Sequence, residues 1–128
     1  MNALKACLLV GAGGFAGSIL RYLTAIFLYR SEQIFSLGTL AANMLGCFLI
    51  GMITQAVGQV SWMSAEVRLL LATGLCGGFT TMSSLILESH HLFKNGNIGG
   101  AGLYLVGTLA LSMTAFIGGM ALVSLITR

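Results

Sequence analysis

The feature that most constrains this chain is a series of four long apolar stretches in which charged residues are rare. The stretches cover approximately residues 4–28, 34–58, 68–93 and 98–126, and polar segments such as "YRSEQ" and "GQVSWMSAE" lie between them. A helix needs about 20 apolar residues to cross about 30 Å of hydrocarbon. We therefore predict an all-α membrane protein with four transmembrane helices, organised as a single transmembrane domain over residues 1–128.

Composition and charge exclude several classes of protein. Charged residues make up 7% of the chain, against roughly a quarter in soluble domains, and mean hydropathy is +0.98. The net charge of +3 comes from basic residues that are scattered singly, whereas nucleic-acid binding requires a clustered basic patch. We therefore expect a multi-pass protein of the cell (inner or plasma) membrane that contacts lipid and binds no nucleic acid.

Positive charges are divided evenly between the two sides that an even number of spans defines. One side carries Lys5, Arg68 and Arg128, and the other carries Arg21, Arg30 and Lys94. Orientation in a membrane normally follows an excess of Lys and Arg on the cytoplasmic side. Because this excess is missing, we expect insertion in both directions, and two oppositely inserted copies can form an antiparallel dimer that encloses a pathway.

Small residues spaced four apart recur in the first two apolar stretches. They are Gly13 and Gly17 in the first stretch, and Gly38, Ala42 and Gly46 in the second. Burying apolar side chains gives little net drive within lipid, so membrane helices associate where small residues let their backbones approach. We expect these positions to be helix contacts.

The third stretch contains the segment "GLCGGFTTMSSL" at residues 74–85, which is rich in glycine and hydroxyl side chains. Glycines tolerate backbone angles that other residues resist, so we predict that the third helix is broken near Gly77–Thr80. Main-chain carbonyls freed at membrane depth must find partners, and they suit a hard cation such as Na⁺. The alternative is a continuous helix whose glycines serve packing alone.

Polar side chains in the last two stretches recur at helical spacing. One stripe contains Thr81, Ser84, Leu85 and Glu88, and the other contains Tyr104, Thr108 and Ser112. A row of hydroxyl groups can pass a small anion along by hydrogen bonds, because each hydroxyl rotates to suit. Serine and threonine in helices can instead bond the carbonyl four residues earlier, which would leave them no part in transport.

Two further polar residues fall inside apolar stretches. Asn43 lies in the middle of the second stretch, and because an amide facing lipid is costly, we expect it to face protein or a pore. Arg21 lies near the end of the first stretch, where it can extend to the interface or take a structural or anion-attracting role at a vestibule. The adjacent His90 and His91 are expected at the membrane interface and not on a metal, because neighbouring rings diverge on a helix.

Three motifs together resemble the Fluc (CrcB) fluoride channels, which are small four-span proteins that assemble as antiparallel dual-topology dimers. They are "GGFAGSILRY" at 13–22, "GTLAANMLGCFLIG" at 38–51 and "GLCGGFTTMSS" at 74–84, in the order and spacing of that family. The resemblance covers essentially the whole chain.

The resemblance implies two fluoride pathways per dimer and one structural Na⁺ that is not transported. Backbone carbonyls that match Gly77 and Thr80 of both copies would hold the Na⁺ at the dimer centre. The residues that the resemblance implies on the ion pathway are Asn43, Ser83, Ser84, Tyr104, Thr108 and Ser112. The polar stripe of the third stretch adds Glu88 to this pathway. Arg21 corresponds to the arginine of the family, in a vestibule or structural role.

One motif departs from the family. The family typically carries FSTF after its two threonines, whereas this chain reads "MSSL", so that Met82 and Leu85 occupy the two phenylalanine positions on the pathway. Neither side chain offers the positive ring edge of phenylalanine. The chain is then either a variant with altered permeation or one half of a heterodimer whose partner, a paralogue, supplies the aromatic rings.

The function that these features predict is passive export of fluoride by a channel, which lowers the cytoplasmic fluoride concentration without enzymatic catalysis. A small multidrug-type exporter also has four spans and dual topology, but it would normally need a carboxylate in the first span, and residues 4–28 contain none. A degenerate subunit of a heterodimeric fluoride channel is the other alternative.

Overall fold

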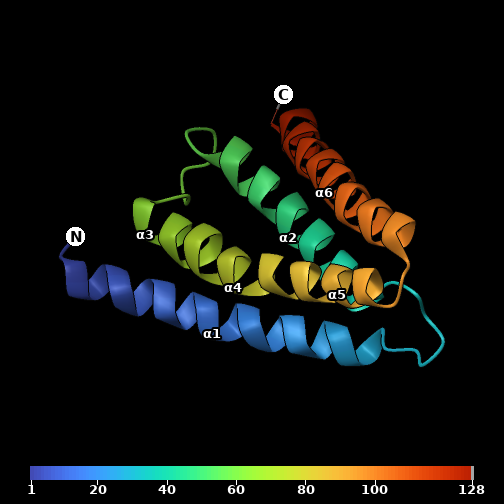
Figure 1. The fold of residues 1–128 in the computed structure, drawn as a ribbon. Helices are drawn as coiled ribbons and strands as arrows, with labels where there is room; N and C mark the ends of the chain where they lie inside the picture. The colour runs from blue at the N-terminus through green and yellow to red at the C-terminus, as the bar shows by residue number, and fades with distance from the viewer. Residues whose placement is uncertain (128) are drawn as a thin grey trace.

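The computed structural model describes residues 1–127, so Arg128, counted among the charges above, lies outside the described part. Its helices are α1 (Ala3–Phe27), α2 (Leu37–Ala56), α3 (Ala65–Arg68), the π-helix η1 (Leu69–Cys76), α4 (Gly77–Phe79), α5 (Met82–Lys94) and α6 (Ile98–Ile126) (Figure 1). Segments α3 to α5 run in one direction and form the third span. The described chain therefore contains four segments long and apolar enough to cross a membrane, which confirms the predicted all-α, four-span fold.

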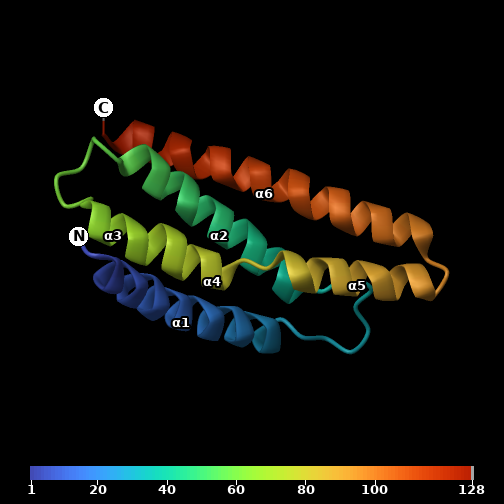
Figure 2. The same cartoon turned by 60° about the vertical axis from the view of Figure 1, so that its left-hand side comes forward.

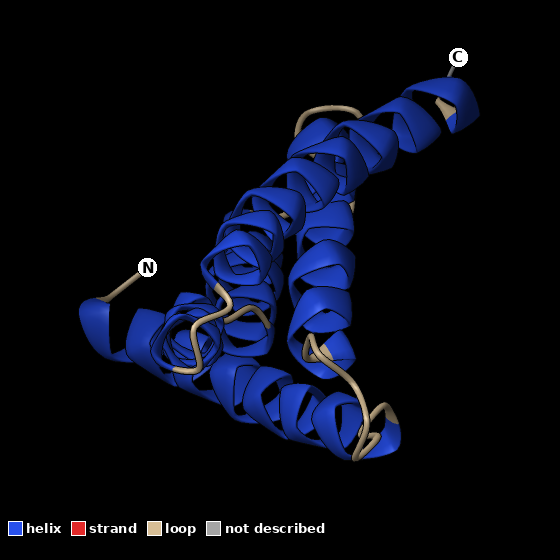
Figure 3. Ribbon diagram, turned by 45° about the vertical axis from the view of Figure 1, so that its right-hand side comes forward, coloured by secondary structure: helices blue, strands red, loops and turns tan. Residues whose placement is uncertain are grey.

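The four spans pack as two pairs, in which α1 packs on the third span and α2 packs on α6. Helix α1 lies along η1 and α4, whereas α2 lies mainly along α6, and α5 joins the pairs by contacting α6 (Figures 1 and 2). Figure 3 shows that helices and loops make up the whole described chain. The pairing leaves large apolar side chains exposed along α1 and α6, as expected for surfaces that face lipid or another copy.

Glycines fix the closest helix contacts. A Cβ added at Gly17 would lie 2.2 Å from the Leu75 carbonyl oxygen, and one added at Gly46 would lie 2.3 Å from the Thr80 side chain. Real Cβ atoms essentially never come this close, so a larger residue would displace the η1 backbone at Gly17 and the Thr80 side chain at Gly46. The expectation that these small residues are helix contacts is confirmed.

The two ends of the bundle differ in composition. At one end α1 and the third span begin together, and the Lys5 ammonium contacts the Glu66 carboxylate at 2.6 Å, with both side chains about half exposed. At the other end α1 finishes, α2 begins, and a tight turn at Gly96 (φ 79°) reverses the chain from α5 into α6 (Figure 2). Lys5 and Arg68 therefore share one end, as the charge count predicts.

The third span is interrupted twice. The turns over Leu69–Cys76 are π-helical, which is wider than an α-helix, and regular structure stops at Thr80 (φ −76°, ψ 154°) and Thr81 (φ −149°, ψ 115°). These extended residues confirm the predicted break. The expected cause was wrong, because Gly77 is helical (φ −62°, ψ −37°) and the chain opens at two threonines. Glycine serves contact here: a Cβ at Gly78 would lie 2.6 Å from a carbonyl oxygen of α1.

Candidate functional site

The break in the third span is held by one side chain of α2. The Thr81 N–H donates to Asn43 Oδ1 at 2.7 Å, and Asn43 Nδ2 donates to the Thr81 carbonyl oxygen at 3.0 Å. Asn43 and Thr81 are 8% and 6% exposed, so no water is at hand to replace either bond. The amide therefore completes a pair of buried main-chain groups that the lost helix leaves open, and it keeps one N–H for another acceptor.

Two N–H groups of this segment bond side chains instead of helix carbonyls, which leaves two carbonyl groups without their helical donors. In a continuous helix the Gly77 carbonyl would accept from Thr81 N–H, and the Thr80 carbonyl would accept from Ser84 N–H. Here Thr81 N–H donates to Asn43, and Ser84 N–H donates to Thr81 Oγ1 at 3.2 Å. The two carbonyls that the resemblance assigns to Na⁺ are thus among those that lose their helical donors at the break. Gly77 is exposed on the surface of the single chain, where a cation shared with another copy has access.

Hydroxyl groups gather at the start of α5. Thr81 Oγ1 lies 3.2 Å from Ser83 Oγ and 3.1 Å from Ser84 Oγ. Thr81 is the N-cap of α5, so the cluster surrounds the positive end of a helix dipole. The structure thereby brings together three hydroxyl side chains of the segment at 80–84.

A second polar cluster lies four residues deeper along α5, around Glu88. The Tyr104 hydroxyl donates to Glu88 Oε2 at 2.7 Å, and the Thr39 hydroxyl donates to Glu88 Oε1 at 2.8 Å. The Phe35 ring stacks on Tyr104 with centroids 5.3 Å apart. Glu88 and Tyr104 were expected on one pathway and do meet. Thr39 was missed, although it stands one helical turn before Asn43 on α2 and could have been found by that spacing.

The stripe on α6 continues from this cluster. Tyr104, Thr108 and Ser112 are 4%, 2% and 8% exposed. Thr108 Oγ1 and Ser112 Oγ are buried without a hydrogen-bond partner within residues 1–127. Elsewhere on the same helix the Thr114 hydroxyl bonds the carbonyl of residue 110, which is the self-satisfied state that sequence alone allowed for all of them. Two buried donors in a row are therefore left for a partner that residues 1–127 of a single chain do not supply.

Two predicted pathway positions point in different directions. Leu85 is 1% exposed and belongs to the core of the chain, whereas Met82 is 56% exposed on its surface. Arg21 is half-buried on α1 and makes no ion pair or hydrogen bond with these clusters in the described part of the chain. The single chain therefore assembles the hydroxyl stripes and the Glu88 cluster but does not bring Met82 or Arg21 to them.

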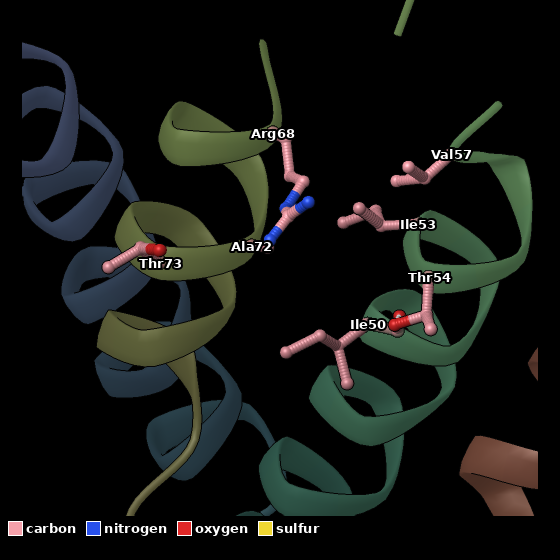
Figure 4. Close-up of a pocket in the computed structure, with 7 residues that line it drawn as sticks. All are labelled: Ile50, Ile53, Thr54, Val57, Arg68, Ala72 and Thr73. Carbon is pink, nitrogen blue, oxygen red and sulfur yellow. Dashed lines mark hydrogen bonds between the residues drawn. The ribbon is translucent and has the colours of Figure 1, made fainter. Parts of the chain in front are cut away.

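A pocket of about 470 Å³ lies between α2 and the third span at the opposite end of the bundle (Figure 4). Its lining residues are Ile50, Ile53, Thr54, Val57, Arg68, Ala72 and Thr73. The Arg68 side chain extends into the gap between the two helices (Figure 4). None of the predicted site residues lines this pocket, so the candidate pathway stays with the hydroxyl stripes.

Several known proteins share extensive sequence with this chain. Residues 8–120 match the family described as "CrcB-like protein, Camphor Resistance (CrcB)". A "Fluoride-specific ion channel FluC" of Prosthecochloris aestuarii is 51% identical over 118 residues, which cover 92% of each chain. Proteins of the same name from Chlorobium phaeobacteroides and Chlorobaculum tepidum are 48% and 45% identical over 94% and 95% of this chain, and over 94% and 97% of their own lengths. With matches of this extent along its whole length, the chain belongs to the CrcB (FluC) family.

Proposed function

We propose that this chain is a fluoride-specific ion channel that lets fluoride leave the cell down its gradient. The observation that carries the proposal is the pair of unpartnered, buried hydroxyls at Thr108 and Ser112, which continue the line that begins at Tyr104. Buried donors without a partner are rare because each costs about 1–3 kcal/mol. A small anion that passes along α6 would satisfy them. The similar proteins described above carry the name of such a channel.

The chemistry of fluoride explains why donors of this kind are needed. Fluoride is strongly hydrated, so a pore must replace the lost water with hydroxyl and amide donors. Thr108 and Ser112 offer one rotatable O–H each, and Asn43 keeps one N–H after bonding Thr81. Ser83 and Ser84 add hydroxyls at the N-terminal end of α5, where the helix dipole favours an anion. These groups release the ion readily because none carries a full positive charge.

We further propose that two oppositely inserted copies form the working unit, with one structural Na⁺ between them. The freed carbonyls of Gly77 and Thr80 in each copy would hold the ion, since unwound main chain is a common Na⁺ ligand in membrane proteins. The cation would offset the repulsion between carbonyl dipoles that the two breaks turn toward each other. Arg21 would then stand at a vestibule that the partner completes.

Met82 and Leu85 occupy the two phenylalanine positions of the family, and their surroundings bear on whether the dimer is formed by two identical chains or by this chain and a paralogue. Leu85 is packed in the core of its own chain, so this position needs no ring from a partner. Met82 is exposed, and a side chain of the second copy can pack against it. We therefore propose a homodimer, in which conduction depends on hydroxyl and amide donors without phenylalanine edges.

The test is release of fluoride from liposomes that contain the purified chain alone. The vesicles are loaded with potassium fluoride, and valinomycin is added so that K⁺ balances the charge. We expect rapid release at a fluoride electrode after valinomycin, little release before it, and no release of chloride under the same conditions. Release that is independent of valinomycin and driven by a proton gradient would contradict a passive channel. If the chain alone releases no fluoride, and release appears only when a paralogue is reconstituted with it, the homodimer is contradicted.

A further inference from the structure

A second polar pocket of about 460 Å³ lies at the end of the bundle where α1 finishes, α2 begins and α5 ends. The loop between α1 and α2 forms one wall and the last turns of α5 form the other (Figure 1). Its polar lining includes Arg30, Gln33, Ser36, Glu88, His91 and Asn95. We call this space the loop chamber. Of its polar lining, only Glu88 belongs to the pathway described above.

The loop chamber adjoins the head of the hydroxyl stripe through Glu88 and Ser36. Glu88 lines the chamber and accepts the Tyr104 hydroxyl at 2.7 Å. The same hydroxyl lies 3.2 Å from the carbonyl oxygen of Ser36, which also lines the chamber. Tyr104 therefore contacts two residues that line the chamber, and Thr108 follows one helical turn along α6.

The charges that face the chamber nearly cancel until a histidine gains a proton. Arg30 and Tyr29 come from the loop, Glu88 and His91 come from α5, and Tyr104 of α6 reaches the chamber through its bond to Glu88. With His91 neutral, the guanidinium and the carboxylate offset one another. Protonation of His91 makes the lining net positive, and histidine is the side chain whose charge changes near neutral pH.

Two further features favour a small polar ligand in this space. Gln33 Oε1 is a buried acceptor without a hydrogen-bond partner in the described chain, so it can accept a hydrogen bond from a water molecule that hydrates an ion in the chamber. Helix α2 begins at the chamber, with Ser36 as its N-cap, and the positive end of its dipole is directed there. Both features are independent of the charges on Arg30 and His91.

We propose that the loop chamber collects fluoride before the ion reaches Tyr104, with Arg30 and His91 as its attracting groups. The inference rests on the proposed function and extends it to a site on the loop between α1 and α2. A cleft with low-dielectric walls focuses the field of its charges and raises the local concentration of a counter-ion. The Arg30 guanidinium offsets the repulsion of an anion by Glu88, and His91 makes the lining net positive when its imidazole is protonated.

The first test changes ionic strength to distinguish electrostatic attraction of fluoride by Arg30 from misfolding of the variant. Liposome flux of the Arg30→Gln variant is compared with that of the unmodified chain at about 10 mM and about 1 M of an impermeant salt, where charges are felt over about 30 Å and about 3 Å. We expect Arg30→Gln to lower flux about threefold or more at low salt and to approach the unmodified chain at high salt. The control is Lys94→Gln, which removes a positive charge near this end of α5 that does not line the chamber.

Arg30→Lys keeps the charge and should conduct like the unmodified chain at both salt concentrations. A reduction in Arg30→Gln that is the same at both concentrations, as a misfolded variant would give, overturns the proposal. An equal loss in Lys94→Gln overturns it as well, because attraction would then depend on the charge of the whole surface. No reduction in any variant has the same consequence.

The second test uses the two adjacent histidines. Flux is measured with equal pH on both sides at steps from pH 8 to pH 6, and protein-free liposomes at each step give the leak of protonated fluoride through lipid. We expect the flux of the unmodified chain to rise as pH falls, the rise to disappear in His91→Gln, and the rise to persist in His90→Gln, whose side chain does not line the chamber. A rise that survives in His91→Gln overturns the role of His91.

The two proposals fail in different ways. An unmodified chain that releases no fluoride at any pH or salt concentration contradicts the channel, and the loop chamber goes with it. An unmodified chain that conducts, with variants that follow neither the salt nor the pH pattern, contradicts the loop chamber alone.

Discussion

Replacement of Asn43 by alanine should destabilise the interrupted segment of the third span at Thr81. The variant removes both bonds between the amide and Thr81, at 2.7 and 3.0 Å, and leaves the Thr81 N–H and carbonyl unpaired where only 6% of that residue is exposed. Hydrogen bonds between membrane helices average about 0.6 kcal/mol each, which sets a lower bound of about 1 kcal/mol for the pair. Unpaired buried groups cost about 1–3 kcal/mol each, which sets an upper bound of about 6 kcal/mol.

We expect the free energy of unfolding to fall by about 3 kcal/mol or more, in the upper part of this range, because water cannot reach Thr81 to replace the lost bonds. SDS titration followed by far-UV circular dichroism measures this loss. Hydrogen exchange measures the loss of the two Asn43–Thr81 bonds directly. The Thr81 amide should change from protected to exchanging, while amides in α6 keep their protection.

The control for this experiment is Thr54→Val on the same helix. The Thr54 hydroxyl is exposed and bonds the carbonyl of Ile50 within α2 at 2.7 Å, so its removal should leave the third span unchanged. If Asn43→Ala unfolds at the SDS fraction of the unmodified chain and the Thr81 amide stays protected, Asn43 does not hold the break. Fluoride flux alone would not decide this, because loss of a pore donor also reduces flux.

Three other substitutions test the packing and the stripe. Gly17→Ala places a methyl group 2.2 Å from a carbonyl oxygen of η1 and should lower stability by about 1–3 kcal/mol in SDS titration, whereas Gly102→Ala, in open space, should not. Thr108→Val keeps the shape of the side chain but removes an unpartnered hydroxyl, so stability should be kept or raised while fluoride flux falls about tenfold, and a loss of stability without loss of flux would contradict its place on the pathway. Lys5→Gln breaks the exposed contact with Glu66 and should leave the SDS midpoint unchanged, because exposed ion pairs contribute little.

The parts of this fold that could be predicted depend on properties that accumulate along the sequence, such as apolar length and the number of charged residues. Apolar length and the rarity of charge define four spans without knowledge of any contact, and spacing of four residues identifies Gly17 and Gly46 as contact positions. The composition of residues 74–85 located the break near Gly77–Thr80, but that the chain opens at Thr80 and Thr81 could not be predicted in this way. This opening depends on Asn43 of α2, which is 38 residues from Thr81 and reaches it only after the helices pack.

The candidate site shows the same division. Helical spacing places Tyr104, Thr108 and Ser112 on one face, and the structure buries all three. Whether a hydroxyl bonds its own helix depends on rotamer choice within the packed core, so the difference between Thr114 and Thr108 could not be foreseen from their residue types. Spacing places Thr39 on the same face of α2 as Asn43, but its bond to Glu88 could not be foreseen because Glu88 belongs to a different span.

The wide turns over Leu69–Cys76 have a consequence for how this chain can change in length. A π-helical turn accommodates a residue more than an α-helical turn between the same hydrogen-bonded ends. Deleting one residue there can be absorbed by narrowing the turn, so that α3 and α4 keep their relative orientation. The same deletion in the middle of α6 would rotate every later side chain by about a hundred degrees about the helix axis. The wide turns therefore preserve the register between α3 and α4, whereas the contacts of Leu70 and Leu75 with Gly13 and Gly17 of α1 still have to be kept.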